Sequence, residues 1–217
     1  MTSINVPSEA TIRKALHEFQ ISVDAHQVVQ IQEYIKLLLK WNDKVNLTAI
    51  RDPLDILYRH FCDSMFAATV VKMDKCRIAD IGSGGGFPGL PLKILWPEST
   101  VVLVESNVKK ATFLAEVVRT LELKNTQVLV SRYEELGEEI APIDYICARA
   151  LGDFVPFLSW AASQKVDVMH ILLWVGEREV AEVQQQKGWE WHIPIPVPQS
   201  LRRIILLGTK AAAANQK

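Results

Sequence analysis

The chain of 217 residues has only three cysteines, Cys62, Cys76 and Cys147, and they stand far apart. They form no Cys-x-x-Cys pair and no Cys/His spacing of the kind that binds zinc. An odd, scattered set of thiols argues against a disulfide framework and against a structural metal. We therefore expect reduced thiols, no bound metal and a cytoplasmic protein.

Long apolar runs and an excess of one charge are also missing. No segment reaches the roughly 18 consecutive apolar residues of a membrane span, and the first residues lack the apolar core of a signal peptide. We expect no membrane partner. The 24 Lys and Arg residues stand against 25 Asp and Glu, a formal charge of −1. This balance gives no general affinity for polyanions, although a local basic patch is enough to bind RNA.

The first 72 residues have the pattern of a helical extension. Apolar residues recur there at helical spacing, at Val28, Ile31, Ile35 and Leu38. Asp52 followed by Pro53 predicts a capped helix that runs to about Val71.

From Arg77 onward, short strand-like runs alternate with amphipathic stretches. Seven runs read as strands, at 77–81, 100–105, 126–130, 143–148, 168–175, 189–195 and 201–207. This alternation predicts an α/β, Rossmann-like fold with a mostly parallel seven-stranded sheet and helices on both faces. The last two runs have no helix between them, so the last strand is expected to be antiparallel. We divide the chain into the extension at 1–72, packed on a sheet domain at 73–210, and a frayed tail at 211–217.

A glycine-rich loop follows the first predicted strand. It reads Gly82-Ser83-Gly84-Gly85-Gly86, directly after Asp80-Ile81, and a helix is expected to begin after it. Glycines allow positive φ and a close approach of the backbone to a ligand, and the following helix start offers free N–H groups. Asp80 could reach that ligand or hold the loop through backbone N–H groups. Glu105 ends the second strand, where a carboxylate can accept hydrogen bonds from ribose hydroxyls.

The spacing of the loop indicates which nucleotide it binds. Dinucleotide sites usually have the pattern GxGxxG, whereas here the glycines stand at 82, 84 and 86 after an acidic residue. That arrangement suits S-adenosylmethionine, which has no pyrophosphate and carries both an ammonium and a carboxylate. A nicotinamide cofactor is the alternative.

Several separated stretches resemble the RsmG (GidB) methyltransferases, which modify N7 of a guanine in small-subunit ribosomal RNA. The similarity covers roughly residues 28–210. Its motifs are Trp41-Asn42 with Asn46-Leu47-Thr48-Ala49-Ile50, His60 with Asp63-Ser64, the glycine loop continuing into Phe87-Pro88-Gly89, Lys109-Lys110 with Phe113-Leu114, and Ala148-Arg149-Ala150.

The resemblance implies a class I methyltransferase, with a ribosomal RNA or 30S particle as its partner. It also implies cofactor contacts at Gly82, Phe87, Glu105, Tyr133, Glu134 and Arg149, to which the loop pattern itself adds Asp80 and Gly84. One position departs from the family, because Val175 precedes Gly176 where a lysine is usual. The absence of that lysine would weaken one contact to RNA or cofactor.

Methylation of guanine N7 needs no catalytic residue in the sense of a general base, because N7 has a free lone pair. The enzyme then supplies proximity and alignment. Cys147 lacks the surroundings of a methyltransferase nucleophile and is expected to be a packing residue. Arg149 is expected to contact cofactor, phosphate or guanine O6, since a donor on N7 would block the reacting atom.

Four further residues are candidates for the substrate side. His60 and Asp63 lie one helical turn apart and either shape the substrate cleft or form a structural hydrogen-bond cluster. Lys109 could contact RNA phosphate or belong to a solvated helix face, and Arg202 begins the last strand beside Arg203. Two other functions remain open at this level: methylation of a small molecule, and a binding module without turnover. We expect a monomer.

Overall fold

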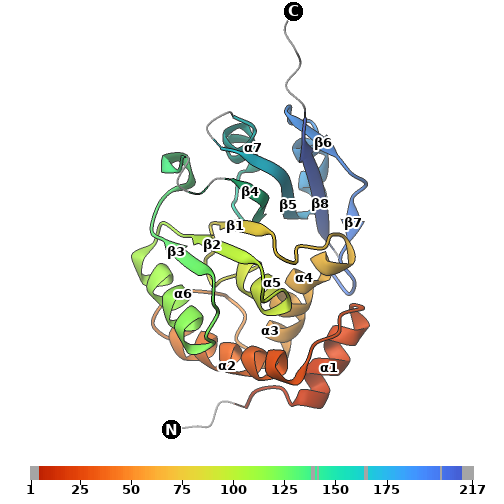
Figure 1. Ribbon diagram of the computed structural model, residues 1–217. Coiled ribbons are helices and arrows are strands. Elements are labelled where there is room, and N and C mark those ends of the chain that lie inside the picture. The colour runs from red at the N-terminus through yellow and green to blue at the C-terminus, as the bar shows by residue number, and fades with distance from the viewer. Residues whose placement is uncertain (1–4, 138–139, 141, 164–165, 201, 212–217) are drawn as a thin grey trace, which may run out of the picture.

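The fold is described from a computed structural model in which residues 5–137, 140, 142–163, 166–200 and 202–211 are placed (Figure 1). Its sheet has the strands β1 (Arg77–Ile81), β2 (Thr100–Val104), β3 (Thr126–Leu129), β4 (Ile143–Arg149), β5 (Val168–Gly176), β6 (Trp189–Trp191), β7 (Ile195–Pro196) and β8 (Arg203–Lys210). Their order is β3-β2-β1-β4-β5-β8-β6, with β7 also paired to β8. Strands β1 to β5 are parallel and β8 is antiparallel to β5, as the sequence predicts.

The sheet has eight strands within the described residues, so the prediction of seven was one short. The segment predicted as a single strand at 189–195 is divided into β6 and β7. Pro194 lies between the two, and a proline has no N–H to donate to a ladder. Leu201, where the last strand was expected to begin, and the tail beyond Ala211 lie outside the described residues.

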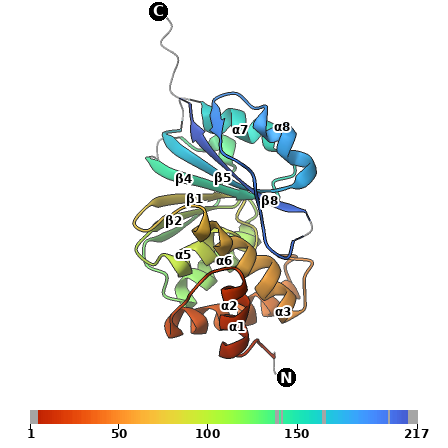
Figure 2. The same cartoon turned by 90° about the vertical axis from the view of Figure 1, so that its right-hand side faces the viewer.

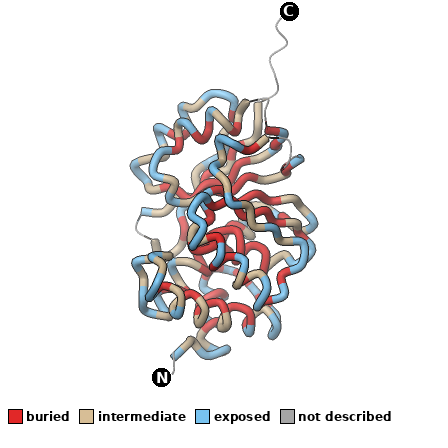
Figure 3. The backbone as a smooth tube through the Cα atoms, turned by 90° about the vertical axis from the view of Figure 1, so that its left-hand side faces the viewer, coloured by how far each residue is buried: buried red, intermediate tan, exposed pale blue. Residues whose placement is uncertain are grey.

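Helices cover both faces of the sheet (Figure 2). One face carries α7 (Phe154–Ala162) and α8 (Val180–Gln184), which follows the short η5 (Glu177–Glu179). The other face carries α5 (Gly89–Leu95) and α6 (Val108–Thr120), with α1 (Glu9–Glu18) and α2 (Ala25–Asn42) packed outside them. Side chains alternate between two cores: Ile78 packs toward the N-terminal helices, whereas Ala79 and Ile81 pack toward α7. Figure 3 shows buried residues running through the strands and the inner helix faces.

The helix predicted after Asp52 runs from Pro53 to Thr69, slightly short of Val71. Asp52 caps it, since its carboxylate accepts hydrogen bonds from the backbone N–H groups of Leu54 and Asp55. The segment is α3 (Pro53–Ile56), η1 (Leu57–Cys62), α4 (Asp63–Met65) and η2 (Phe66–Thr69), and η1 is a π-helix. Wider π turns occur frequently at functional sites, and this one carries His60.

The parallel strands fix the position of the site. The carboxyl ends of β1, β2, β4 and β5 meet at one edge of the sheet, which is where open α/β sheets bind ligands.

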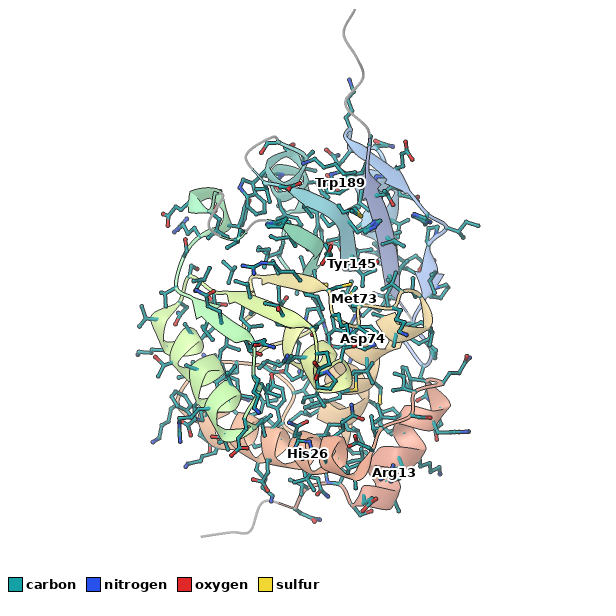
Figure 4. The ribbon with its side chains drawn as sticks, viewed as in Figure 1. Arg13, His26, Met73, Asp74, Tyr145 and Trp189 are labelled. Atoms are coloured by element: carbon teal, nitrogen blue, oxygen red, sulfur yellow. The ribbon has the colours of Figure 1, made fainter. Side chains whose placement is uncertain are left out.

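The connection from η2 reaches β1 through Met73 and Asp74 (Figure 4). Trp189 on β6 lies far from Arg13 and His26 on the N-terminal helices.

Candidate cofactor and substrate site

The glycine loop leaves β1 in the conformation that its composition predicts. Gly82, Gly84 and Gly86 have φ of +69°, +56° and +89°. At Gly82 a side chain would also overlap Leu151, since an added Cβ would lie 2.6 Å from its Cδ2. Gly82 and Ser83 donate to the Val104 carbonyl at 2.9 and 3.0 Å, which holds the loop against the end of β2.

Glu105 fixes the loop from the end of β2. Its carboxylate accepts a hydrogen bond from the backbone N–H of Gly84 at 2.8 Å and another from that of Asn107 at 2.8 Å. Each carboxylate oxygen has a further lone pair, so the group can accept hydrogen bonds from ribose hydroxyls without leaving the loop. The structure therefore gives Glu105 a second role that the spacing alone did not predict.

Asp80 holds the glycine loop from its buried side. Its side chain is fully buried, and Oδ2 accepts a hydrogen bond from the Gly89 N–H at 3.0 Å, at the start of α5. Oδ1 is buried without a hydrogen-bond partner among the described residues. Burial raises the pKa of Asp80 to about 7, and the Gly89 N–H only partly opposes that rise. Of the two roles considered for Asp80, the observed contacts are those of a loop anchor.

A hollow of about 270 Å³ lies beside the loop. Its apolar walls are Ile81, Val104 and Leu151, and its polar rim comes from Ser106 and from the segment Ser131–Glu134 that follows β3. This segment contains η3 (Tyr133–Glu135), where Tyr133 packs edge-on against Phe157 and Trp160. An apolar slot with polar groups at one end, next to a glycine backbone and a carboxylate, fits the adenosine part of S-adenosylmethionine.

A second and larger hollow, of about 790 Å³, opens at the ends of β4 and β5. Four arginines line it: Arg59 from η1, Arg149 from β4, Arg202 just before β8, and Arg203 as the first residue of β8. Asp55, Asp63 and Glu179 line it as well. Asp63 is the buried counter-charge, because its carboxylate forms an ion pair with Arg203. Burial raises the pKa of Asp63, while Arg203 and Arg149 oppose the rise. This hollow, called the arginine cavity below, therefore has four guanidinium groups against three carboxylates in its lining.

Arg149 lines the larger hollow, and Leu151, two residues further along the chain, lines the smaller one. Its Nη2 donates to the Arg59 carbonyl at 2.8 Å, and Nη1 is buried without a partner among the described residues. Burial, together with the charge of Arg203, lowers the pKa of Arg149 to about 10, so the guanidinium stays cationic at neutral pH. An unpaired buried donor of this kind calls for an anionic or carbonyl acceptor.

The structure places the other residues predicted for the site at different positions relative to the two hollows. His60 contacts Arg149 but is not among the residues lining the arginine cavity. The Phe87 ring is buried between Tyr34 and His60, and Phe87 is not among the residues that line the cofactor hollow. Arg202 is exposed at the cavity rim. Lys109 is exposed at the start of α6, outside the lining of either hollow.

Three contributors were missed from the sequence. Arg59 and Arg203 supply cations to the cavity, and Tyr34 of α2 donates a hydrogen bond to the Gly85 carbonyl at 2.5 Å. Asn42 satisfies the backbone of the following loop, because its side chain forms hydrogen bonds with the backbone of Leu47 and Thr48. The polar pair Asn42 and Thr48 beside an apolar helix was the available signal for this junction.

In the described part of the chain, no helix is both long and apolar enough to cross a membrane. The same residues contain no group of three or more His, Cys, Asp or Glu side chains that could hold a metal ion.

The architecture matches that of methyltransferases of known structure. A SAM-dependent methyltransferase from Aquifex aeolicus superposes with a TM-score of 0.60 at 16% identity, over 76% of this chain and 97% of that one. A predicted O-methyltransferase from Agrobacterium tumefaciens gives a TM-score of 0.53 at 23% identity, over 70% and 82%. These likenesses show the fold, a Rossmann-like sheet of the kind found in S-adenosylmethionine-dependent methyltransferases.

Sequence comparison narrows the class to one family. The family model for GidB, rRNA small subunit methyltransferase G, matches residues 27–192. Ribosomal RNA small subunit methyltransferase G of Pseudomonas aeruginosa is 37% identical over 160 residues, 74% of each chain. The protein of that name from Chloroflexus aggregans is 41% identical over 144 residues, 65% of this chain and 60% of its own. The chain therefore belongs to this family, and it is a methyltransferase that uses S-adenosylmethionine.

Proposed function

We propose that this protein methylates N7 of a guanine in small-subunit ribosomal RNA, as a cytoplasmic monomer. The observation that carries the proposal is the arginine cavity beside the cofactor hollow, in a chain of this family. The net charge of −1 gives no sign of this cavity, because its arginines come from separate parts of the chain, at η1, β4 and the beginning of β8. Phosphate groups of RNA provide the anions that such a cluster binds. This local charge favours RNA over a small neutral metabolite as substrate.

In this proposal, separate groups of residues bind the cofactor and the RNA. Gly82 and Gly84 present backbone to the cofactor, Glu105 accepts from its ribose, and Tyr133 and Glu134 lie beside its adenine. Bound S-adenosylmethionine supplies an electrophilic methyl group on a sulfonium. Arg149, with Arg59, Arg202 and Arg203, orients the RNA through phosphate or guanine O6, and leaves N7 free. Since N7 loses no proton when it is methylated, alignment is the main contribution of the protein.

The test is transfer of labelled methyl from S-adenosylmethionine to 30S particles and to naked small-subunit RNA, followed by nucleoside analysis. We expect 7-methylguanosine as the labelled product. Gly84→Asp should abolish transfer, because it places a second carboxylate against Glu105. Asn125→Asp is the matched control: it adds the same charge at an exposed left-handed position at the opposite end of the sheet.

Four outcomes contradict parts of the proposal. Label in another methylated nucleoside would refute the N7 assignment alone. Transfer to metabolites but to neither RNA substrate would establish the small-molecule alternative. Binding of S-adenosylmethionine without transfer to any substrate would identify a binding module. Sedimentation equilibrium of the active protein at a mass above 24.5 kDa would refute the monomer.

A further inference from the structure

His60 makes contacts with three separate parts of the site. Its Nδ1 lies 3.3 Å from Nη2 of Arg149, and its Nε2 lies 2.7 Å from the hydroxyl of Thr48. Its ring also stacks on that of Phe87, with centroids 4.5 Å apart and planes 19° apart. These contacts come from the end of β4, the loop after α2 and the glycine loop.

The hydrogen-bond partners define the protonation state of His60. A guanidinium only donates, so the contact with Arg149 assigns Nδ1 as the acceptor, without a hydrogen. The hydrogen must then be on Nε2, which donates to Thr48 Oγ1. That hydroxyl oxygen accepts a second hydrogen bond, from the Ile50 N–H at 3.1 Å. A protonated imidazolium would direct an N–H group at the Arg149 guanidinium.

The ring stack continues from His60 into the glycine loop. Phe87 stacks in turn on Tyr34, with centroids 5.3 Å apart and planes 2° apart, and the Tyr34 hydroxyl bonds the Gly85 carbonyl. The His60 ring therefore connects the arginine that faces the substrate with the loop that faces the cofactor. Aromatic pairs of this kind contribute beyond their buried area.

We propose that His60 is a positioning residue: as a neutral imidazole with its hydrogen on Nε2, it orients the Arg149 guanidinium and supports the glycine loop through Phe87. This deepens the function of the same site and rests on the proposed function. His60 does not touch the substrate or the cofactor in this role. It acts through Arg149 on one side and Phe87 on the other.

The electrostatic surroundings support a neutral imidazole. Burial, and then the positive charge of Arg149, lowers the pKa of His60 to about 3, and a hydrogen bond with the Arg59 backbone opposes this only in part. The charges of Arg203 on β8 and Arg59 on the same helix also lower the pKa, and Asp63 is the nearby carboxylate that carries the ion pair with Arg203. His60 should therefore remain neutral between pH 5 and 8.

Two substitutions separate the polar contacts of His60 from its ring. His60→Phe keeps the stack on Phe87 but has no acceptor for Arg149. His60→Asn has no ring but places an amide oxygen close to the position of Nδ1. We expect the Phe variant to keep a urea midpoint near that of the wild type and to lose about tenfold in kcat/KM for 30S particles, the loss expected for one hydrogen bond to a charged group. The Asn variant should be less stable yet recover part of that loss per folded molecule.

A purely structural role would order the two variants in the same way for stability and for activity. The inference is overturned if the Phe variant is as active as the wild type, or if the Asn variant is no more active than the Phe variant. A wild type that methylates neither 30S particles nor RNA would count against the proposed function instead.

A second measurement does not depend on turnover. The chain has five histidines, so the His60 signals can be assigned in ¹⁵N-edited spectra by comparison with His60→Phe. We expect the Nε2–H tautomer, unchanged between pH 5 and 8. A titration near the ordinary value for histidine, about 6.5, or an Nδ1–H tautomer would refute the proposed hydrogen bonds.

Discussion

Gly86 is the position where the glycine loop has least room, so its replacement tests the packing of the loop on α2. Gly86 has φ +89°, and an added Cβ would overlap the Tyr34 hydroxyl. It would also lie 2.5 Å from Leu90 Cδ1 and 3.1 Å from Leu114 Cδ2. We predict that Gly86→Ala is among the most destabilising alanine substitutions in the site.

The magnitude has three sources. A left-handed backbone costs an L-residue about 1–2 kcal/mol. Overpacking of a close-packed site costs about 1–3 kcal/mol. Displacement of the Tyr34 hydroxyl leaves the Gly85 carbonyl without its bond, at about 1–3 kcal/mol. The expected loss of about 3–8 kcal/mol is comparable with the whole stability of a domain of this kind, about 5–15 kcal/mol.

A double-mutant cycle with Tyr34→Phe isolates the overlap. Removing the hydroxyl makes room for the new methyl group, so Gly86→Ala should cost at least about 1 kcal/mol less in the Phe background. The assay is urea unfolding followed by the fluorescence of the six tryptophans. Gly84→Ala is the matched control: its φ is also positive, but the nearest atom to an added Cβ is 3.7 Å away. Costs that simply add, or a control as damaging as Gly86→Ala, would refute this account of the loop.

Three further predictions concern the charged groups. Asp80 is protonated more readily in the folded than in the unfolded protein, so its contribution to stability is present below about pH 4 and is lost as pH rises to about 7. Asp80→Asn should therefore be less costly at pH 8 than at pH 5, and a cost independent of pH would contradict this. Arg203→Met leaves the buried Asp63 carboxylate unpaired and should lower the free energy of unfolding by about 3 kcal/mol, with most of it recovered by adding Asp63→Asn. No recovery in urea unfolding would argue against the ion pair. Glu105→Gln should weaken S-adenosylmethionine binding about tenfold in calorimetry, because neutral acceptors bond more weakly, and unchanged affinity would exclude Glu105 from the ribose contact.

Much of the fold could be predicted because its signals are local. The run 77–81 is a strand bounded by a glycine loop, and the structure has β1 at those residues. Asp52 and Pro53 mark a helix start that the structure confirms. The division of 189–195 into two strands was missed, because alternation alone does not show that Pro194 interrupts the ladder. The π turns of η1 were also missed, since no sequence pattern distinguishes them from an α-helix.

The candidate site also has one part that local sequence predicts and another part that it does not. The glycine loop and Glu105 are close in sequence to the strands that place them, so spacing could predict that they lie together, and Gly84 indeed donates a hydrogen bond to Glu105. The partners of Arg149 could not be predicted in this way, because the Arg59 carbonyl and the His60 ring lie 90 and 89 residues away along the chain. Contacts of this kind depend on how the N-terminal helices dock on the sheet, which composition and periodicity do not encode.

The departure at Val175 shows how the fold changes the meaning of a sequence difference. Val175 is 2% exposed, belongs to the core that faces α7, and brings no charge to the arginine cavity that it helps to line. Antiparallel pairing of β5 with β8 places Arg203 directly opposite Gly176. Arg203 lines the cavity and forms an ion pair with Asp63, so this end of the sheet has a cation although position 175 does not supply one. The effect of a missing lysine therefore has to be judged from the neighbouring strand, which the linear sequence places 28 residues away.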